Sequence, residues 1–207
     1  MANLILPPSL EAADKIRLIQ DSARFDIADA NELTAAEIAD LEAIRAPHAP
    51  PTVPKVGLSN DCIFNCSYCS CRAGLECRQR YTCTPREMAE IAVQAAKNNP
   101  TRGVFVTSGI YKDADYTEEL IVETLRIMRQ ELRYSGYIHA KIMPGADPEL
   151  IEQAGWLADR LSVNIELPRS EGYAIIAKQK NKTNILTPMG EISRRVRDHT
   201  GEFNAAG

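Results

Sequence analysis

The sequence reads Asp61-Cys62-Ile63-Phe64-Asn65-Cys66-Ser67-Tyr68-Cys69 in its first half. Cysteines separated by three and then two residues can bind one metal centre from a single loop, because thiolates are soft ligands suited to iron, zinc or copper(I). A structural zinc site or a closed iron–sulfur site takes four protein ligands, so a set of three leaves one metal position open for a substrate or cofactor. The spacing therefore predicts a reactive metal centre held by Cys62, Cys66 and Cys69.

The composition is that of a globular domain without a strong electrostatic bias. With 207 residues and 44% hydrophobic content, the chain is long enough for one sizeable core. Its 24 basic and 28 acidic side chains give a formal net charge of -4, which excludes a global positive field that would draw the protein to nucleic acid. No apolar run reaches the ~20 residues of a membrane span, and residues 1–8 lack the features of a signal peptide. We therefore expect a cytoplasmic protein with no membrane partner, whose six cysteines serve metal binding or redox chemistry rather than disulfides.

Prolines divide the chain into two parts. The stretch 46–54 contains four prolines, which is too many for a helix or a central strand, and it is predicted to be a linker. Before it, helices are expected over residues 9–21 and from Thr34, where Glu37 completes a capping box. The predicted division is therefore a helical extension with a proline-rich linker at 1–53 and a main domain at 54–207.

The main domain repeats a pattern of strand, loop and helix. Strands are expected at 55–59, 103–107, 137–142 and 161–167. The residues expected to start helices are Thr84 with Glu87, Asp115 with Glu118, and Asp147 with Pro148, and the last of these helices can end at Gly155. A further helix is expected over 184–198, with an apolar stripe of Ile185, Met189, Ile192 and Val196. Four strand–helix units in sequence predict an α/β fold with a parallel sheet, in the form of a partial TIM-like (β/α) barrel.

Polar residues occur where these strands are predicted to end. Ser59, Thr107 and Lys141 lie near the carboxyl ends of the first three strands, which is the end where barrels carry their active sites. In the fourth strand, Asn164 and Glu166 alternate with apolar residues and so fall on one face. An apolar interior would not tolerate such groups without partners, so we expect these polar side chains to converge at one mouth.

The cysteine spacing, with an aromatic residue before the last cysteine, resembles the signature of the radical S-adenosylmethionine (SAM) superfamily. Further runs resemble a bacterial subfamily described as DNA modification or repair radical SAM proteins, and this resemblance covers the chain roughly from Lys15 onward. These runs are Thr107-Ser108-Gly109-Ile110, Gly136-Tyr137-Ile138-His139, Pro144-Gly145-Ala146-Asp147-Pro148-Glu149-Leu150-Ile151 and Asp159-Arg160-Leu161-Ser162-Val163-Asn164-Ile165-Glu166-Leu167-Pro168.

The resemblance implies a cofactor set and a reaction. Cys62, Cys66 and Cys69 would hold three irons of a 4Fe-4S cluster, and SAM would chelate the fourth iron. A donor such as a flavodoxin or ferredoxin would supply the electron for reductive cleavage of SAM, and the resulting 5′-deoxyadenosyl radical would abstract hydrogen from a substrate. The cofactor performs this step, while the protein orients it and excludes water.

The resemblance also implies SAM-binding residues. Thr107, Ser108 and Gly109 occupy the segment after the second strand, which holds the SAM amino group in the superfamily. This chain departs from the frequent Gly-Gly-Glu there, because Ser108 and Gly109 bring no carboxylate, so Thr107 or backbone carbonyls are the alternative contacts. The other candidates are Tyr68 for the adenine, Asn164 and Glu166 for the ribose or methionine part, and Lys141 for a carboxylate of SAM or substrate; a lysine that only snorkels from the strand end is the alternative for Lys141.

Simpler interpretations compete with each of these assignments. A zinc or closed iron–sulfur site could be completed by Cys71, Cys77 or Cys83, although these three are more simply free thiols outside the signature. His139 is expected to be an interior histidine with a hydrogen-bond partner rather than a ligand. The arginines expected to be solvated surface charges are Arg78, Arg80, Arg194, Arg195 and Arg197.

Three functional hypotheses follow. The first is a radical SAM enzyme that modifies or repairs DNA. The second is a non-catalytic iron–sulfur or zinc-binding fragment or interaction module. The third is a radical SAM enzyme that acts on a small molecule or a protein. The resembling subfamily continues with the remaining barrel strands and a helix-hairpin-helix region, from which its DNA association is inferred, so the 54–207 domain is expected to be a truncated barrel whose DNA contact lies outside this chain.

Overall fold

The computed structural model describes residues 53–75, 80–99, 101–167 and 169–205. The helices predicted within 1–52, most of the proline-rich linker, Cys77 and Arg78 lie outside these described residues. No helix in the described ranges combines the length and the apolar character that crossing a membrane requires.

The described residues form a parallel sheet of four strands in the order β1-β2-β3-β4. The strands are β1 (Lys55–Gly57), β2 (Gly103–Thr107), β3 (Tyr137–Lys141) and β4 (Arg160–Ser162). In register, Val56 lies beside Val106, Val106 beside Ala140, and Ala140 beside Leu161. This confirms the predicted α/β fold and the parallel arrangement of a partial TIM-like barrel.

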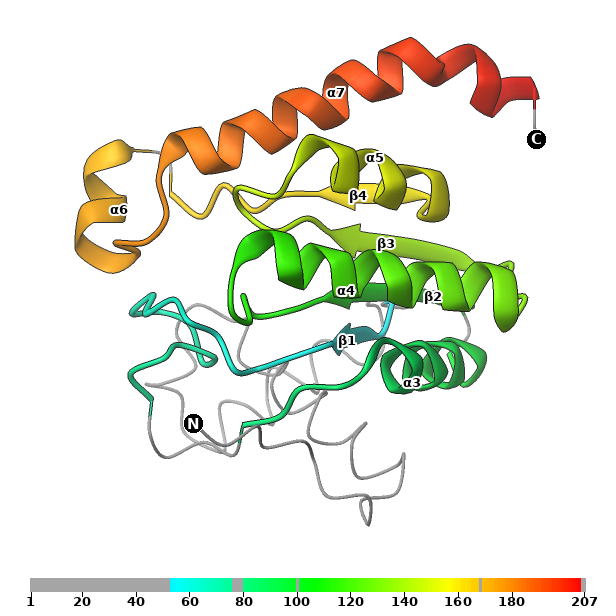
Figure 1. Ribbon diagram of the computed structural model, residues 1–207, viewed down its shortest axis with the longest axis horizontal. Helices are drawn as coiled ribbons and strands as arrows, with labels where there is room; N and C mark the ends of the chain where they lie inside the picture. Colours follow the sequence, from blue (N-terminus) through cyan, green and yellow to red (C-terminus); the bar gives the residue numbers. More distant parts are fainter. Residues whose placement is uncertain (1–52, 76–79, 100, 168, 206–207) are drawn as a thin grey trace, which may run out of the picture.

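Helices α3 (Pro85–Lys97), α4 (Ala114–Arg126) and α5 (Pro148–Leu157) connect these strands. Figure 1 shows them side by side in the same order as the strands they follow. Alternate strand residues such as Val104, Val106 and Ile138 are fully buried in the hydrophobic core. The apolar helix faces contribute to the same core through Met88, Ala92, Ile121, Leu125, Met128, Ile151 and Ala154. The opposite face of the sheet carries Lys55, Phe105, His139 and Lys141, all partly exposed.

Helices α3 and α5 begin where the sequence predicts. Thr84 is the N-cap of α3, and it forms a capping box with Glu87 in which each side chain accepts the other's backbone N–H, at 3.2 and 2.9 Å. Asp147 caps α5 ahead of Pro148. The prediction that Gly155 ends α5 is wrong, because the helix continues to Leu157. A single glycine costs a helix only about 1 kcal/mol, and Leu157 packs against the core.

The predicted start of α4 is also wrong. Its N-cap is Asp113 rather than Asp115, and the Asp113 side chain accepts the backbone N–H of Tyr116 at 2.8 Å. The helix runs through Arg126 into the π-helix η1 (Ile127–Glu131). Asp115 and Glu118 bind the loop between β3 and α5 instead of capping the helix.

Strand β4 is shorter than the predicted 161–167, because extended pairing stops at Ser162. The chain then leaves the sheet: Glu166 has a left-handed φ of 62°, and the Tyr173 hydroxyl donates to the carbonyls of Ile165 and Leu167. We predicted that Asn164 and Glu166 share one face because side chains alternate along an extended strand. This reason is wrong, because both residues lie beyond the end of β4. Strands β1 and β3 are also shorter than predicted, ending at Gly57 and Lys141.

Two helices follow β4. The short α6 (Ser170–Ile176) was not predicted, and α7 (Lys182–Ala205) extends beyond the predicted 184–198 at both ends. Of the predicted stripe on α7, Ile185 is buried, but Val196 is 56% exposed and does not belong to it. Figure 1 shows α7 alongside α5, and the Arg195 guanidinium binds the Glu152 carboxylate at 2.7 Å between them.

Glu118 generates a prediction about stability and pH. Burial raises its pKa to about 8, and the charge of Asp115 adds to this effect, whereas the hydrogen bond from the Met143 N–H opposes it. The unfolded chain releases this proton near pH 4.5 and the folded chain keeps it to about pH 8, so the free energy of unfolding should fall as pH rises through this window. The slope from this one group approaches about 1.4 kcal/mol per pH unit.

Glu118→Gln should remove this slope, and urea unfolding of both proteins between pH 5 and 8 measures it. Glu119→Gln, at an exposed position of the same helix, is the matched control and should follow the unmodified protein. A difference between Glu118→Gln and the unmodified protein that stays constant with pH would contradict the prediction.

Candidate functional site

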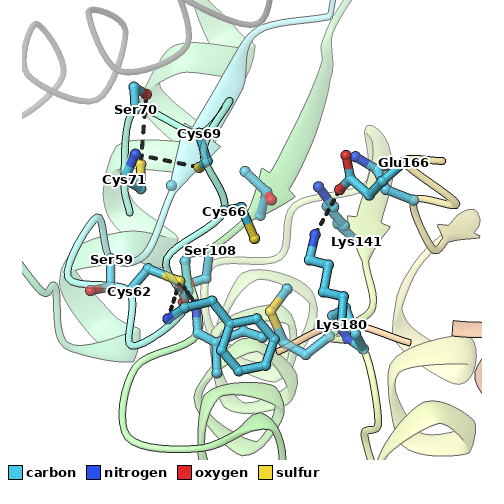
Figure 2. Close-up of a pocket in the computed structure, with 18 of the residues that line it drawn as sticks. Ser59, Cys62, Cys66, Cys69, Ser70, Cys71, Ser108, Lys141, Glu166 and Lys180 are labelled. Atoms are coloured by element: carbon cyan, nitrogen blue, oxygen red, sulfur yellow. Dashed lines mark hydrogen bonds and ion pairs between the residues drawn. The ribbon is translucent and has the colours of Figure 1, made fainter. Parts of the chain in front are cut away.

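A cavity of about 650 Å³ lies along the sheet face that carries Lys55, Phe105 and Lys141, and it extends to the carboxyl ends of the strands (Figure 2). Every site residue predicted from the sequence lines it: Cys62, Cys66, Tyr68, Cys69, Thr107, Ser108, Gly109, Lys141, Asn164 and Glu166. Figure 2 shows the cysteines on one side of this space and Lys141, Glu166 and Lys180 on the other. The structure therefore brings together residues from the loop after β1, the ends of β2 and β3, and the segment after β4.

The cysteine loop presents its thiols within a frame of backbone amides. Cys66 is only 4% exposed, and Cys62 and Cys69 are partly buried. The N–H groups of Phe64 and Ile110 donate to Cys62 Sγ at 3.4 and 3.3 Å, and the N–H of Cys71 donates to Cys69 Sγ at 3.4 Å. Amide hydrogen bonds to sulfur stabilise thiolate ligands and tune the metal that they bind.

The thiols differ in how readily they ionise. Burial raises the pKa of Cys62 and of Cys66. Cys69 has its pKa lowered to about 6, chiefly by a hydrogen bond from the Cys71 side chain, and burial only partly opposes this effect. Cys69 therefore ionises readily near neutral pH, whereas Cys62 and Cys66 stay protonated until metal binding displaces their protons.

The three predicted ligands are thiols that line one cavity, and thiolates are the ligands that a 4Fe-4S cluster takes. Within the described ranges, no group of three His, Cys, Asp or Glu side chains converges closely enough to hold one metal ion. The thiolates that hold a 4Fe-4S cluster bind different irons, so they surround the cluster instead of meeting at one point. Cys62, Cys66 and Cys69 likewise lie around one cavity. Cys71 also lines the cavity, whereas Cys83 is buried in the hydrophobic core and does not line it.

The loop after β2 touches the cysteine loop directly. The N–H of Gly109 donates to the Ser59 carbonyl at 2.8 Å, and the Ser108 hydroxyl donates to the Gly109 carbonyl at 2.6 Å. A Cβ on Gly109 would lie 3.0 Å from Cys62 Cβ and 3.2 Å from the Ser59 carbonyl oxygen. A side chain at this position would push the two loops apart, which explains a glycine there.

An ion pair faces the cysteines across the cavity. Lys180 Nζ lies 2.8 Å from Glu166 Oε1 and donates to the Tyr68 hydroxyl at 3.3 Å. Burial acts to raise the pKa of Glu166, but the hydrogen bond and charge of Lys180 outweigh it, and the pKa is lowered. Burial lowers the pKa of Lys141, and the neighbouring Lys180 charge adds to this effect. The carboxylate is therefore held ionised within reach of two lysines.

Sequence reasoning missed Lys180 and Lys55, which also line the cavity. Lys180 follows the unpredicted helix α6, in a stretch with no motif or strand pattern. Lys55 stands at the start of β1, and its inward direction follows from alternation along the strand, a signal that could have found it.

A third wall of the cavity comes from Met143 and Pro144 in the loop between β3 and α5. Two acidic side chains of α4 hold this loop by its backbone. Glu118 Oε2 accepts the Met143 N–H and Asp115 Oδ1 accepts the Asp147 N–H, both at 2.8 Å. Among the described residues, Glu118 Oε1 is the buried side-chain oxygen without a hydrogen-bond partner.

The other polar residues singled out in the sequence are His139 and several arginines. His139 Nε2 lies 2.7 Å from Ser162 Oγ and its ring stacks on Phe105 with centroids 4.3 Å apart, which confirms a histidine with a side-chain partner. Arg194 and Arg195 pair with Glu191 on α7. The prediction that Arg80 is a solvated surface charge is wrong, because its guanidinium binds backbone carbonyls of the cysteine loop.

Comparison with known protein families shows which superfamily the chain belongs to. The model of the radical SAM superfamily matches residues 56–198, which is more than half of its length. The chain belongs to the radical SAM superfamily. The matched region contains every residue of the cavity wall except Lys55.

Solved structures show the same fold. One match is a crystal structure of HydG, a maturase of the FeFe-hydrogenase, over 89% of this chain and 45% of that chain, with a TM-score of 0.56 and 14% identity. Another is the FeFe-hydrogenase maturase HydG from Carboxydothermus hydrogenoformans, over 91% of this chain and 42% of that chain, with a TM-score of 0.56 and 19% identity. The chain thus spans less than half the length of these structures. No curated protein matches it.

The Lys180–Glu166 pair generates a prediction. Lys180→Met should raise the pKa of Glu166 and lower the free energy of unfolding at pH 7 by about 1–3 kcal/mol, because a largely buried carboxylate loses its cation. The folded-state pKa of Glu166 lies below its ordinary 4.5, so this stabilisation is present above pH 4.5 and is lost as pH falls through the folded pKa.

Urea unfolding at pH 7 and in acid measures the effect. Lys178→Met, at an exposed position in the same segment, should cost little at either pH. An equal loss for Lys180→Met at both pH values would show that lost packing, not the ion pair, is responsible.

Proposed function

We propose that this domain is a radical SAM enzyme unit that binds a 4Fe-4S cluster through Cys62, Cys66 and Cys69 and cleaves SAM reductively to methionine and a 5′-deoxyadenosyl radical. The observation that supports it most is that thiols with the superfamily spacing border one cavity, beneath backbone N–H donors, within the region matched to the superfamily. When bound, the cluster would supply the electron that breaks the carbon–sulfur bond of SAM.

The side chains around the cavity have separate roles in this proposal. Thr107, Ser108 and Gly109 offer backbone carbonyls and a hydroxyl to the SAM ammonium, in a loop pressed against Cys62. Lys141, whose own positive charge is destabilised by burial, gains from contact with a carboxylate. Tyr68 offers an aromatic face for the adenine, with its hydroxyl tied to Lys180.

Asn164 and Glu166 are proposed to contact the ribose or methionine part of SAM. Both residues line the cavity, and Figure 2 shows Glu166 opposite the cysteines. Glu166 stays ionised because of Lys180 and can accept hydrogen bonds from hydroxyl groups, whereas the Asn164 amide can both donate and accept them.

The electron donor is proposed to be a flavodoxin or ferredoxin. Ile63, on the cysteine loop, is 47% exposed and does not line the cavity, so it offers an apolar contact close to the predicted cluster from outside. An electron can then reach the cluster without passing through the SAM-binding space.

DNA modification or repair stays the proposed use of the radical, and it rests on the resemblance of the sequence runs. Small molecules and proteins are the alternative substrates. Among the described arginines, Arg194 and Arg195 pair with acidic side chains on their own helix, and they do not supply support for DNA binding.

Anaerobic reconstitution with iron and sulfide tests the proposed reaction. The reduced protein should give a cluster signal in electron paramagnetic resonance that shifts when SAM is added, and it should form 5′-deoxyadenosine. Cys66→Ala should lose both, because the cluster loses an iron ligand. Cys83→Ala is the matched control, since this cysteine is buried in the core away from the cavity, and it should keep both. A signal that ignores SAM would favour a metal-holding module, and binding of zinc alone would overturn the proposal.

Deuterium transfer tests the substrate. Reconstituted protein is turned over with SAM and fully deuterated DNA, and in parallel with deuterated protein and small-molecule extracts. The pool that contains the substrate should place deuterium in the 5′-deoxyadenosine, because the radical abstracts a hydrogen from it. Label from the protein or small-molecule pool, with none from DNA, would overturn the DNA assignment.

A further inference from the structure

The guanidinium of Arg80 lies behind the cysteine loop and binds its backbone. Nη1 donates to the carbonyls of Asn60 and Cys71 at 2.6 and 2.8 Å, and Nη2 donates to those of Arg72 and Leu75 at 2.5 and 3.1 Å. Asn60 precedes the first cysteine of the motif, and the other three carbonyls follow the last one. One side chain thus ties together the two ends of the segment that carries Cys62, Cys66 and Cys69.

This arrangement suits arginine alone. The guanidinium has five N–H donors in a planar fork, so it can satisfy several carbonyls at once in fixed directions. Among the described residues, Arg80 makes no ion pair with a carboxylate, and its guanidinium donates to backbone carbonyls. Lysine would keep the charge, but its single ammonium could not span the same set of acceptors.

The main chain that follows Arg80 is anchored independently of the guanidinium. Asn60 N donates to the Tyr81 carbonyl at 3.2 Å, and Asn60 Oδ1 accepts the Tyr81 N–H at 2.7 Å. Cys83 N donates to the Leu58 carbonyl at 2.8 Å, and Ser59 forms an antiparallel bridge with Thr82. The arginine therefore reaches into the loop from a segment that is fixed to the extension of β1, so it can act as a rigid support.

The contacts of Arg80 continue to a predicted iron ligand. Arg80 fixes the carbonyl of Cys71, and the N–H of the same residue donates to Cys69 Sγ at 3.4 Å. Cys71 is thus held on both sides of its Cα, by the guanidinium and by the sulfur. Displacing the guanidinium should loosen the amide that stabilises the Cys69 thiolate.

We propose that Arg80 is the positioning residue of the cluster site: its guanidinium holds the cysteine loop in the ligand-presenting conformation and places a fixed positive charge behind the cluster. The first part stands on the contacts above, and the second part rests on the proposed 4Fe-4S cluster. A positive charge near the cluster stabilises its reduced, more negative form and so raises its reduction potential.

Hydrogen exchange of the metal-free protein tests the first part without any cofactor. In Arg80→Met, the amides of Cys71 and Ala73 should exchange at least about tenfold faster than in the unmodified protein, because the loop carbonyls lose their shared donor. Amides of β2 and β3 should exchange as before. Arg86→Met removes an arginine that pairs with Glu131 on the surface of the helices, and it should leave the loop unchanged.

Reconstituted protein tests the second part. Arg80→Lys and Arg80→Met should both lose iron to a chelator several-fold faster than Arg86→Met, since neither variant can bridge the loop. Only Arg80→Met should shift the reduction potential to a more negative value, since Arg80→Lys keeps the charge. A merely structural role would not separate the two variants in this measurement.

The outcomes are distinguishable. Unchanged loop exchange in Arg80→Met would overturn the positioning role, and equal potentials for the two variants would overturn the electrostatic role. If Arg80→Met loses protection throughout the sheet, Arg80→Lys supplies the exchange comparison, and the same expectation applies to it. If the unmodified protein binds no cluster, the proposed function fails, while the exchange experiment still decides whether Arg80 holds the loop.

Discussion

The register of β1 against β2 is the constraint on which the site depends. Gly57 lies beside Thr107, so both strands end at one level and the loops that follow them meet. Leu58 N and Gly109 N donate across this junction to the carbonyls of Thr107 and Ser59, and Ile110 N donates to Cys62 Sγ. A parallel pair of strands thus places Cys62, a proposed cluster ligand, against the segment proposed to bind SAM, and a shift of one residue in register would separate them.

The loops around the cavity obey the rule that buried backbone groups need partners. They lack regular secondary structure, so side chains satisfy them. Glu118 and Asp115 accept N–H groups from the loop between β3 and α5, and the Arg80 guanidinium donates to carbonyls of the cysteine loop. These side chains act on loop conformation from outside the cavity. None of the three lines it, but Glu118 and Arg80 bind the backbone of Met143 and Cys71, which do.

Cysteine thiols and charged side chains lie on opposite sides of the cavity. The thiols of the cysteine loop, buried or partly buried, lie on one side, and Lys141 and the Lys180–Glu166 pair lie on the other. Thiolates that bind a cluster bring negative charge into a partly desolvated space, and the lysines opposite supply compensating positive charge. The same burial that disfavours an isolated charge on Cys66 and on Lys141 makes their combination with a cluster and an anionic ligand group more favourable.

The sequence by itself determined the superfamily, the α/β fold, the β2 strand, the caps of α3 and α5, and ten of the residues that line the cavity. These follow from short-range signals: cysteine spacing, capping pairs and the two periodicities. Tertiary structure alone decided the end of β4 at Ser162, the buried role of Glu118, and the contacts of Lys180 and Arg80. Each of these depends on neighbours distant in sequence: Arg80 contacts Asn60 twenty residues earlier, and Glu118 contacts Met143 twenty-five residues later. Local patterns describe how a segment can fold, whereas the partner of a charged side chain is set only when separate loops pack together.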